Sequence, residues 1–148
     1  MCDINMLGFE GVSMSVKRIH HINFIVKDLD EGIKYYERIL GDGVFVKDDL
    51  TKRGVATART NIDGQWFVLV QPTDLESVPG RHFKEHGEGF FLISFEVESM
   101  EKSVSEFESK GLAFTDASDR KGLLNWWIRD LKKNNSTSPQ IQLCEERD

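Results

Sequence analysis

The side chains best suited to chemistry in this chain are histidine, carboxylate and amide groups that recur two residues apart. His21 and Asn23 form one such pair, Ser94 and Glu96 form another, and Gln142 stands near the C-terminus. Residues two apart in an extended strand point to the same face of a sheet. Histidine can bind a metal ion or transfer a proton near neutral pH. A carboxylate in partly apolar surroundings has a raised pKa, which makes Glu96 a candidate general base; the alternative is a rim residue held by a lysine or an arginine.

Two other groups of reactive residues are weaker candidates. His82, Glu85 and His86 lie on one predicted helical turn, but the glutamate does not directly follow the first histidine, as it does in zinc-metalloprotease helices. We interpret this stretch as the polar end of a helix. Only Cys2 and Cys144 are present, too few for a disulfide scaffold or a thiolate zinc site. Cys144 is predicted to be a small buried residue.

The composition is that of one ordinary globular domain. The chain has 148 residues, of which 39% are hydrophobic and 30% charged, and its formal net charge is −6. An acidic protein repels nucleic-acid phosphates, so we expect no nucleic-acid partner. No apolar run approaches the roughly 20 residues that cross a bilayer, so we expect no membrane partner, and residues 1–16 lack the pattern of a secretory signal. We therefore expect a flexible leader at 1–16, one domain at 17–148, and a cytoplasmic location with reduced thiols.

The elements that would position these side chains follow a clear order. Residues 18–26 alternate between apolar and polar types, which predicts a strand. Asp28 precedes Glu31 by three residues, an arrangement that caps the start of a helix, and Gly41 is placed to end that helix. One face of this helix is apolar at Leu29, Ile33, Tyr36 and Leu40. Three further strands are predicted at 43–48, 54–62 and 65–70, the last two joined by the hairpin turn Asp63-Gly64.

The same order of elements recurs later in the chain. A shift of 71 positions superposes Ile22 on Ile93 and carries the first helix onto residues 100–107. Ser99 is placed to cap this second helix and Gly111 to end it. We infer an internal duplication of a strand–helix–three-strand unit. The remaining assignments are strands near Phe114 and at 123–130 and 140–144, a solvated turn at Lys132–Lys133, module 1 at about 17–72 and module 2 at about 88–146.

This doubled βαβββ pattern, with a histidine on its first strand, resembles the vicinal oxygen chelate superfamily, which includes glyoxalases, bleomycin-resistance proteins and extradiol dioxygenases. The resemblance spans residues 18–145 and rests on the stretches His20–Asp28, Trp66–Pro72 and His86–Phe90. Residues 66–97 are most similar to methylmalonyl-CoA epimerases and to the N-terminal half of 4-hydroxyphenylpyruvate dioxygenases. The resemblance implies an α+β fold in which two tandem modules form one curved mixed sheet around a cup, with the helices packed outside. A shared scaffold does not fix the chemistry.

In metal-bearing members of this superfamily, four side chains converge in the cup on a divalent cation. The resemblance places these positions at His21, Val68, Leu92 and Gln142. Valine and leucine have no lone pair for a cation, so no resident metal is predicted, and His21 and Gln142 are the remaining candidate ligands. A rebuilt site with Glu96 is an alternative, but Glu96 lies four residues beyond Leu92, about 13 Å along a strand, and ligands must converge on one point.

Alternation along the strands divides the sheet into an apolar outer face and a mixed cup face. His20 is expected to face the helix layer or solvent. Trp126 and Trp127 are adjacent, so one indole is expected on each face, and one of them walls the cup. Polar residues inside a cup favour a ligand site over an ordinary core. The predicted ligand-binding residues are His21, Asn23, Trp66, Ser94, Trp126 and Gln142.

These features predict a protein of the glyoxalase and bleomycin-resistance type that binds a small organic molecule in the cup without a metal ion. The alternative is an enzyme of the same superfamily: a lyase, an isomerase such as an epimerase, or a dioxygenase. It would use either a rebuilt site for a divalent metal or Glu96 or His21 as a metal-free base. A third hypothesis is a partner subunit whose cup is vestigial. Exposed strand edges favour pairing between copies, so we also expect a homodimer.

Overall fold

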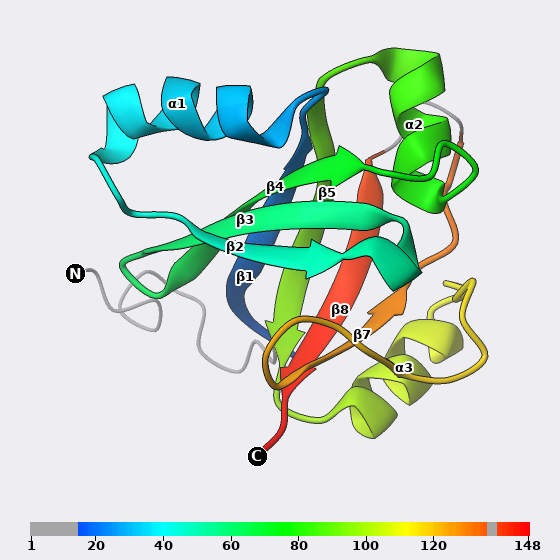
Figure 1. Ribbon diagram of the computed structural model, residues 1–148. Helices are drawn as coiled ribbons and strands as arrows, with labels where there is room; N and C mark the ends of the chain where they lie inside the picture. Colours follow the sequence, from blue (N-terminus) through cyan, green and yellow to red (C-terminus); the bar gives the residue numbers. More distant parts are fainter. Residues whose placement is uncertain (1–14, 136–138) are drawn as a thin grey trace.

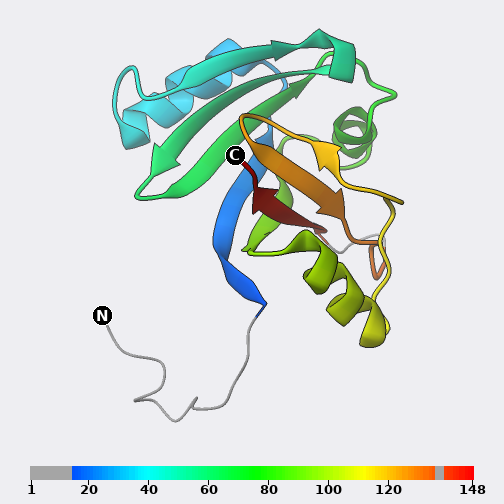
Figure 2. The ribbon, with the colours of Figure 1, turned by 90° about the horizontal axis from the view of Figure 1, so that it is seen from below.

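The fold is one curved sheet of eight strands (Figure 1; Figure 2). The computed structural model describes residues 15–135 and 139–148. The expected leader therefore lies outside the described residues except for its last two positions, and Val16 already begins the first strand. In chain order the elements are β1 (Val16–Ile25), α1 (Leu29–Leu40), β2 (Val46–Leu50), the short helix η2 (Thr51–Arg53), β3 (Val55–Ile62), β4 (Gln65–Pro72), α2 (Val78–His86), β5 (Gly89–Val97), α3 (Met100–Ser109), β6 (Arg120–Lys121), β7 (Trp126–Asp130) and β8 (Gln140–Glu146).

The strand order joins the two predicted modules edge to edge. It is β2-β3-β4-β1-β5-β8-β7-β6, so each module contributes one half of the sheet. Within each half the first and last strands of the module pair in parallel, β1 with β4 and β5 with β8. At the junction β1 and β5 are antiparallel, and Ile22 lies opposite Ile93, its counterpart in the duplication. The predicted α+β fold of two tandem modules in one curved mixed sheet is confirmed.

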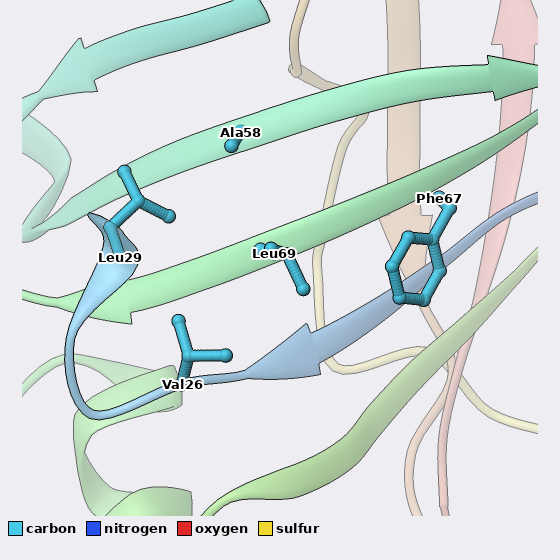
Figure 3. Packing of buried hydrophobic residues seen from close by; sticks show 5 residues of the cluster. All are labelled: Val26, Leu29, Ala58, Phe67 and Leu69. Atoms are coloured by element: carbon cyan, nitrogen blue, oxygen red, sulfur yellow. The ribbon is translucent and has the colours of Figure 1, made fainter. Parts of the chain in front are cut away.

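Helices α1 and α3 each pack on the apolar outer face of one half of the sheet. Asp28 caps α1 by accepting a hydrogen bond from the Glu31 amide at 3.0 Å, and Ser99 caps α3 in the same way. In module 2, Met100 of α3 packs with Leu143 of β8. These contacts leave the opposite face of the sheet free of helices α1 and α3. The corresponding cluster of module 1 comprises Val26, Leu29, Ala58, Phe67 and Leu69 (Figure 3).

A third helix, α2, connects the modules. Its C-terminal end holds the polar residues His82, Glu85 and His86, which the sequence indicates as a helix end, and Gly87 follows at a φ of 76°. Ser77 begins the helix by accepting a hydrogen bond from the Gly80 amide at 3.1 Å. The sequence predicts that all helices pack outside the cup. For α2 this prediction is wrong, because the first turn of α2 lines the cavity described below. Among the described residues, no helix combines the length and apolar character that crossing a membrane requires.

One irregularity in β1 overturns the expected position of His20. The pairing of β1 with β5 shifts register between Ile19 and His21, so His20 has no partner across the junction. Such a bulge places two successive residues toward the same side of the sheet. His20 therefore turns into the protein rather than toward the helix layer or solvent, and its side chain is completely buried.

Candidate functional site

The concave side of the sheet holds a cavity of about 1090 Å³. His21 of β1, Val68 of β4, Leu92 of β5 and Gln142 of β8 all line it, although they come from four different strands of the two modules. The parallel pairs bring them together, because β4 lies beside β1 and β8 beside β5. The four positions that the resemblance singles out therefore meet in one cavity.

The six residues predicted to bind a ligand divide into two groups. His21, Asn23, Trp126 and Gln142 line the cavity. Ser94 and Trp66 do not: Ser94 is fully buried beneath the lining, and Trp66 packs against the Trp126 ring with 5.6 Å between centroids. Alternation places both residues on the cup face, but neighbouring side chains cover Ser94, and Trp66 packs on Trp126 while remaining partly exposed. Whether the four lining residues bind a ligand stays a prediction.

Trp126 forms the buried end of the cup. Its indole is 3% exposed and stacks on the His21 ring at 4.6 Å with 17° between the planes. The His20 ring meets the same indole edge-on at 4.7 Å. Trp127 lies on the opposite face under the Arg147 guanidinium, 4.9 Å from the ring centroid. The adjacent indoles thus point to opposite faces of the sheet, and Trp126 is the one that walls the cup.

The two histidines form a buried hydrogen-bonded chain. His20 Nε2 lies 2.7 Å from a Glu146 carboxylate oxygen, and because an ionised carboxylate only accepts, the histidine nitrogen donates. The Nδ1 atoms of His20 and His21 are 2.8 Å apart, so one of these two nitrogens carries a proton and donates it to the other. Burial, reinforced by the neighbouring His20, lowers the pKa of His21 to about 3. His21 therefore enters the cup as a neutral imidazole.

Four buried oxygen atoms around the cup lack a hydrogen-bond partner within the described part of the chain. They belong to Asn23, Thr57, Ser94 and Gln142, and Gln142 already donates through its amide nitrogen to Asp130 at 2.9 Å. A buried polar group without a partner costs about 1–3 kcal/mol. Such orphaned polar atoms are uncommon in a core. Three of the four residues, Asn23, Thr57 and Gln142, line the cavity, which favours a cup that receives polar groups of a ligand. Thr57 carries no sequence signal for this role, since a threonine in a strand is ordinary.

The environment of Glu96 differs from the one that was expected. Burial alone would raise the pKa of its carboxyl, but a hydrogen bond from Arg18 and the charges of Arg18 and Lys17 outweigh burial and lower that pKa. The Arg18 Nε atom lies 2.6 Å from the carboxylate and the Lys17 Nζ atom 3.5 Å from it. The predicted raised pKa is therefore wrong. As in the alternative given above, the Glu96 carboxylate is held by an arginine and a lysine. It does not line the cavity.

Replacing Glu96 with glutamine is expected to lower the free energy of unfolding at pH 7 by about 1–2 kcal/mol, because the charge-assisted hydrogen bond to Arg18 is lost. A carboxyl whose pKa is depressed by folding contributes stability above its unfolded pKa and loses that contribution as the pH falls through its folded pKa. The difference between wild type and variant should therefore shrink as the pH falls from 7 to 3 in urea titrations.

Glu31→Gln is the control for that titration. Its exposed pair with Lys34 is of a kind worth less than about 1 kcal/mol. An effect of Glu96→Gln that stayed constant across the pH range would contradict the ion-pair explanation.

The donor set of the four lining positions does not fit a divalent cation. Val68 and Leu92 are aliphatic, and a cation needs nitrogen, oxygen or sulfur donors. Among the described residues, two other groups of donor atoms lie within 4.8 Å of one another: His20, His21 and Cys144, and His20, Glu96 and Glu146. The first contains a thiol whose pKa is raised by burial, and the second contains the carboxylate that Arg18 holds.

The helix α2 histidines do not join either group. His82 and His86 contact each other with 4.6 Å between ring centroids, and His82 also packs against Phe91. Burial lowers the pKa of His82. In the described part of the chain, these two histidines belong to no set of three close donor atoms, which agrees with the interpretation of this stretch as a helix end.

A basic mouth, defined as Arg53, Arg81, Lys132 and Lys133, also lines the cavity. The sequence interpretation of the lysine pair as a solvated turn missed this position. No local pattern could reveal it, because the four side chains come from η2, α2 and the segment after β7.

Comparison with known proteins agrees with this architecture. A family model described as the glyoxalase/bleomycin resistance protein/dioxygenase superfamily matches residues 20–129. The uncharacterized protein YwkD of Bacillus subtilis (strain 168) is 26% identical over 99 residues, which are 67% of this chain and 76% of that protein. The metallothiol transferase FosB of Lysinibacillus sphaericus (strain C3-41) is 34% identical over 62 residues, 42% of this chain and 40% of that protein. The chain thus matches less than half the length of FosB.

Solved structures of similar fold include two epimerases. A Streptomyces coelicolor methylmalonyl-CoA epimerase in complex with 2-nitronate-propionyl-CoA has a TM-score of 0.81 at 25% identity, covering 90% of this chain and all (100%) of that one. The methylmalonyl-CoA epimerase of Mycobacterium tuberculosis has a TM-score of 0.83 at 22% identity, covering 95% of this chain and 96% of that one. At that identity the likeness concerns the fold alone. With the family model matched over most of its length, this chain belongs to the glyoxalase/bleomycin resistance protein/dioxygenase superfamily.

Proposed function

We propose that this protein binds a small organic molecule in the cup between its two modules and that the positions His21, Val68, Leu92 and Gln142 hold no metal ion. The observation that carries the proposal is the set of three orphaned oxygen atoms on residues that line the cavity, Asn23, Thr57 and Gln142. Such atoms are uncommon in an ordinary core, whereas a ligand site needs a few polar groups to orient its guest.

The size and walls of the cavity support the same conclusion. Its volume of about 1090 Å³ slightly exceeds the roughly 300–1,000 Å³ of pockets that bury drug-sized molecules. Val55, Val70 and Ile128 supply apolar surface, and Thr57 and Asn23 supply the orphaned acceptors. Apolar walls of this kind favour an organic guest over a small hydrated ion. We further propose that the protein is cytoplasmic and forms a homodimer, as predicted from the sequence.

A second candidate function, a metal-dependent lyase, isomerase or dioxygenase, has one specific observation in its favour. Donor atoms of His20, Glu96 and Glu146 lie within 4.8 Å of one another, next to the cup. FosB, which matches part of the chain, is named a metallothiol transferase. Against this candidate, Arg18 is bound to Glu96, and its positive charge opposes a cation at the same carboxylate.

Binding of the neutral dye N-phenyl-1-naphthylamine, followed by its fluorescence, tests the proposal. In EDTA we expect saturable binding of about one dye per chain. Thr57→Phe places a ring in the cavity and should lower the affinity about tenfold, which is about 1.4 kcal/mol. The matched control Ile62→Phe changes an exposed residue of the same strand outside the cavity and should leave affinity within about twofold.

Two results would overturn the proposal. Equal affinity of Thr57→Phe and wild type would show that the dye does not enter the cup. Binding that requires Mn²⁺, Co²⁺, Ni²⁺ or Zn²⁺, with stoichiometric metal retained after gel filtration, would favour the metal-dependent candidate. A thermal-melting comparison of the two variants with wild type checks that both are folded.

A further inference from the structure

We infer that the ligand of the cup is an amphiphilic anion, whose apolar body enters the cavity and whose carboxylate or phosphate group is bound by the basic mouth (Arg53, Arg81, Lys132 and Lys133). This inference rests on the proposed function and specifies the chemical class of the guest. The charge of the lining is the observation that carries it.

The cavity lining is basic although the chain is acidic. Six cationic side chains and two carboxylates line the cavity, a net charge of +4, whereas the whole chain has a net charge of −6. Both carboxylates, Asp116 and Asp130, are bound by Arg120, and Lys121 contacts the Leu124 carbonyl. The positive charge left over therefore comes from the four residues of the basic mouth.

None of these four cations has an ion-pair partner within residues 15–135 and 139–148. The chain contains 25 acidic residues, and many of its other cations are paired, including Arg18, Lys47, Arg59 and Arg129. Leaving four like charges uncompensated around one opening raises the energy of the folded protein through their mutual repulsion. An anionic group bound among them would relieve that repulsion.

The basic mouth is assembled from distant parts of the chain. Arg53 ends η2 of module 1, Arg81 lies in the first turns of α2, and Lys132 and Lys133 follow β7 of module 2. Figure 1 shows η2, α2 and the segment after β7 along the same side of the molecule, at the right of the view. The charge of Lys133 also helps to lower the pKa of His82, the residue after Arg81, so Lys133 is close to α2.

The position of the charges relative to the apolar surface determines the kind of anion. Positive groups at the opening of a cavity with apolar walls concentrate their field in the opening, because the walls screen poorly. Deeper in the cup, Val68, Val70 and Leu92 offer no charge, and His21 is a neutral imidazole because burial lowers its pKa to about 3. A guest that satisfies both regions has an apolar or aromatic body and a terminal negative charge.

Two dyes that share one aromatic skeleton test the inference. 1-Anilinonaphthalene-8-sulfonate is N-phenyl-1-naphthylamine with an added sulfonate, so any difference between them reports on the charge. At low salt we expect the sulfonate to bind wild type more tightly than the neutral dye. Its affinity should fall as NaCl is raised, since salt screens exposed charges, while that of the neutral dye should change little.

The double variant Lys132→Gln/Lys133→Gln is expected to lower the affinity for the anionic dye about tenfold and to leave the affinity for the neutral dye within about twofold. Lys52→Gln/Lys102→Gln is the matched control, because it makes the same change of net charge at exposed positions that do not line the cavity. This control variant should bind both dyes with the affinity of wild type.

Competition experiments distinguish the two sources of negative charge. Octanoate and octyl phosphate should each displace the anionic dye from wild type, with the tighter of the two identifying the group that the site prefers, while neutral 1-octanol should displace it poorly. The inference is overturned if the two double variants have equal affinity for the anionic dye. If the neutral dye does not bind at all, the proposed function fails, and the inference fails with it.

Discussion

Replacing Trp126 with alanine is expected to lower the free energy of unfolding by about 3–5 kcal/mol, the range for a large aromatic side chain lost from a core. The indole is 3% exposed, stacks on His21, meets the edge of His20 and packs against Trp66. Its loss would leave the buried pair of histidines without an apolar cover. Urea unfolding at pH 7 measures the change, and binding of the neutral dye should weaken in the same variant, because Trp126 walls the cavity.

Trp127→Ala is the control for this experiment. The same side chain is removed one residue along the same strand, but from the outer face, where Trp127 is only partly buried under Arg147. We expect a cost of about 1–2 kcal/mol and unchanged dye binding. If both variants lost equal stability, the assignment of Trp126 alone to the closed end of the cup would be wrong.

Replacing Gly80 with alanine is expected to destabilise the protein by about 3 kcal/mol or more. An added Cβ atom would lie 2.4 Å from the carbonyl oxygen of Asp74 and 2.6 Å from the Cα atom of Leu75. These are backbone atoms, which cannot rotate away as a flexible side chain would. The direction of this change in stability is informative, because replacing glycine with alanine inside a helix ordinarily stabilises a protein by about 0.5–1 kcal/mol.

The same substitution should also alter the cup. Gly80 lies in the first turn of α2, and Val78 and Arg81 of that helix line the cavity, so moving the helix away from residues 74–75 moves a wall of the site. Gly122→Ala is the control for stability only, since its nearest contacts would be ordinary ones at 3.4 Å but Gly122 itself lines the cavity. Equal melting temperatures for Gly80→Ala and wild type would show that α2 does not pack as closely as described.

The sequence by itself determined the scaffold. The buried surfaces are indicated by apolar residues at every second position in strands and along one face of each helix. This pattern is local in the sequence, so it can be recognised without knowledge of the tertiary structure. The shift that carries Ile22 to Ile93 also indicated two equivalent halves, and those residues lie opposite each other in the sheet. The resemblance to the vicinal oxygen chelate superfamily implied that His21, Val68, Leu92 and Gln142 meet, and all four line one cavity.

Only the tertiary structure decided the surroundings of the functional side chains. A single bulge turned His20 inward, where it contacts Glu146, 126 residues away. Arg18 reaches Glu96 across 78 residues and lowers the carboxyl pKa that burial alone would have raised. The basic mouth joins η2, α2 and the segment after β7. A pKa, a hydrogen bond and a binding surface depend on groups that meet through space, and no periodicity along the chain encodes which distant residues those are.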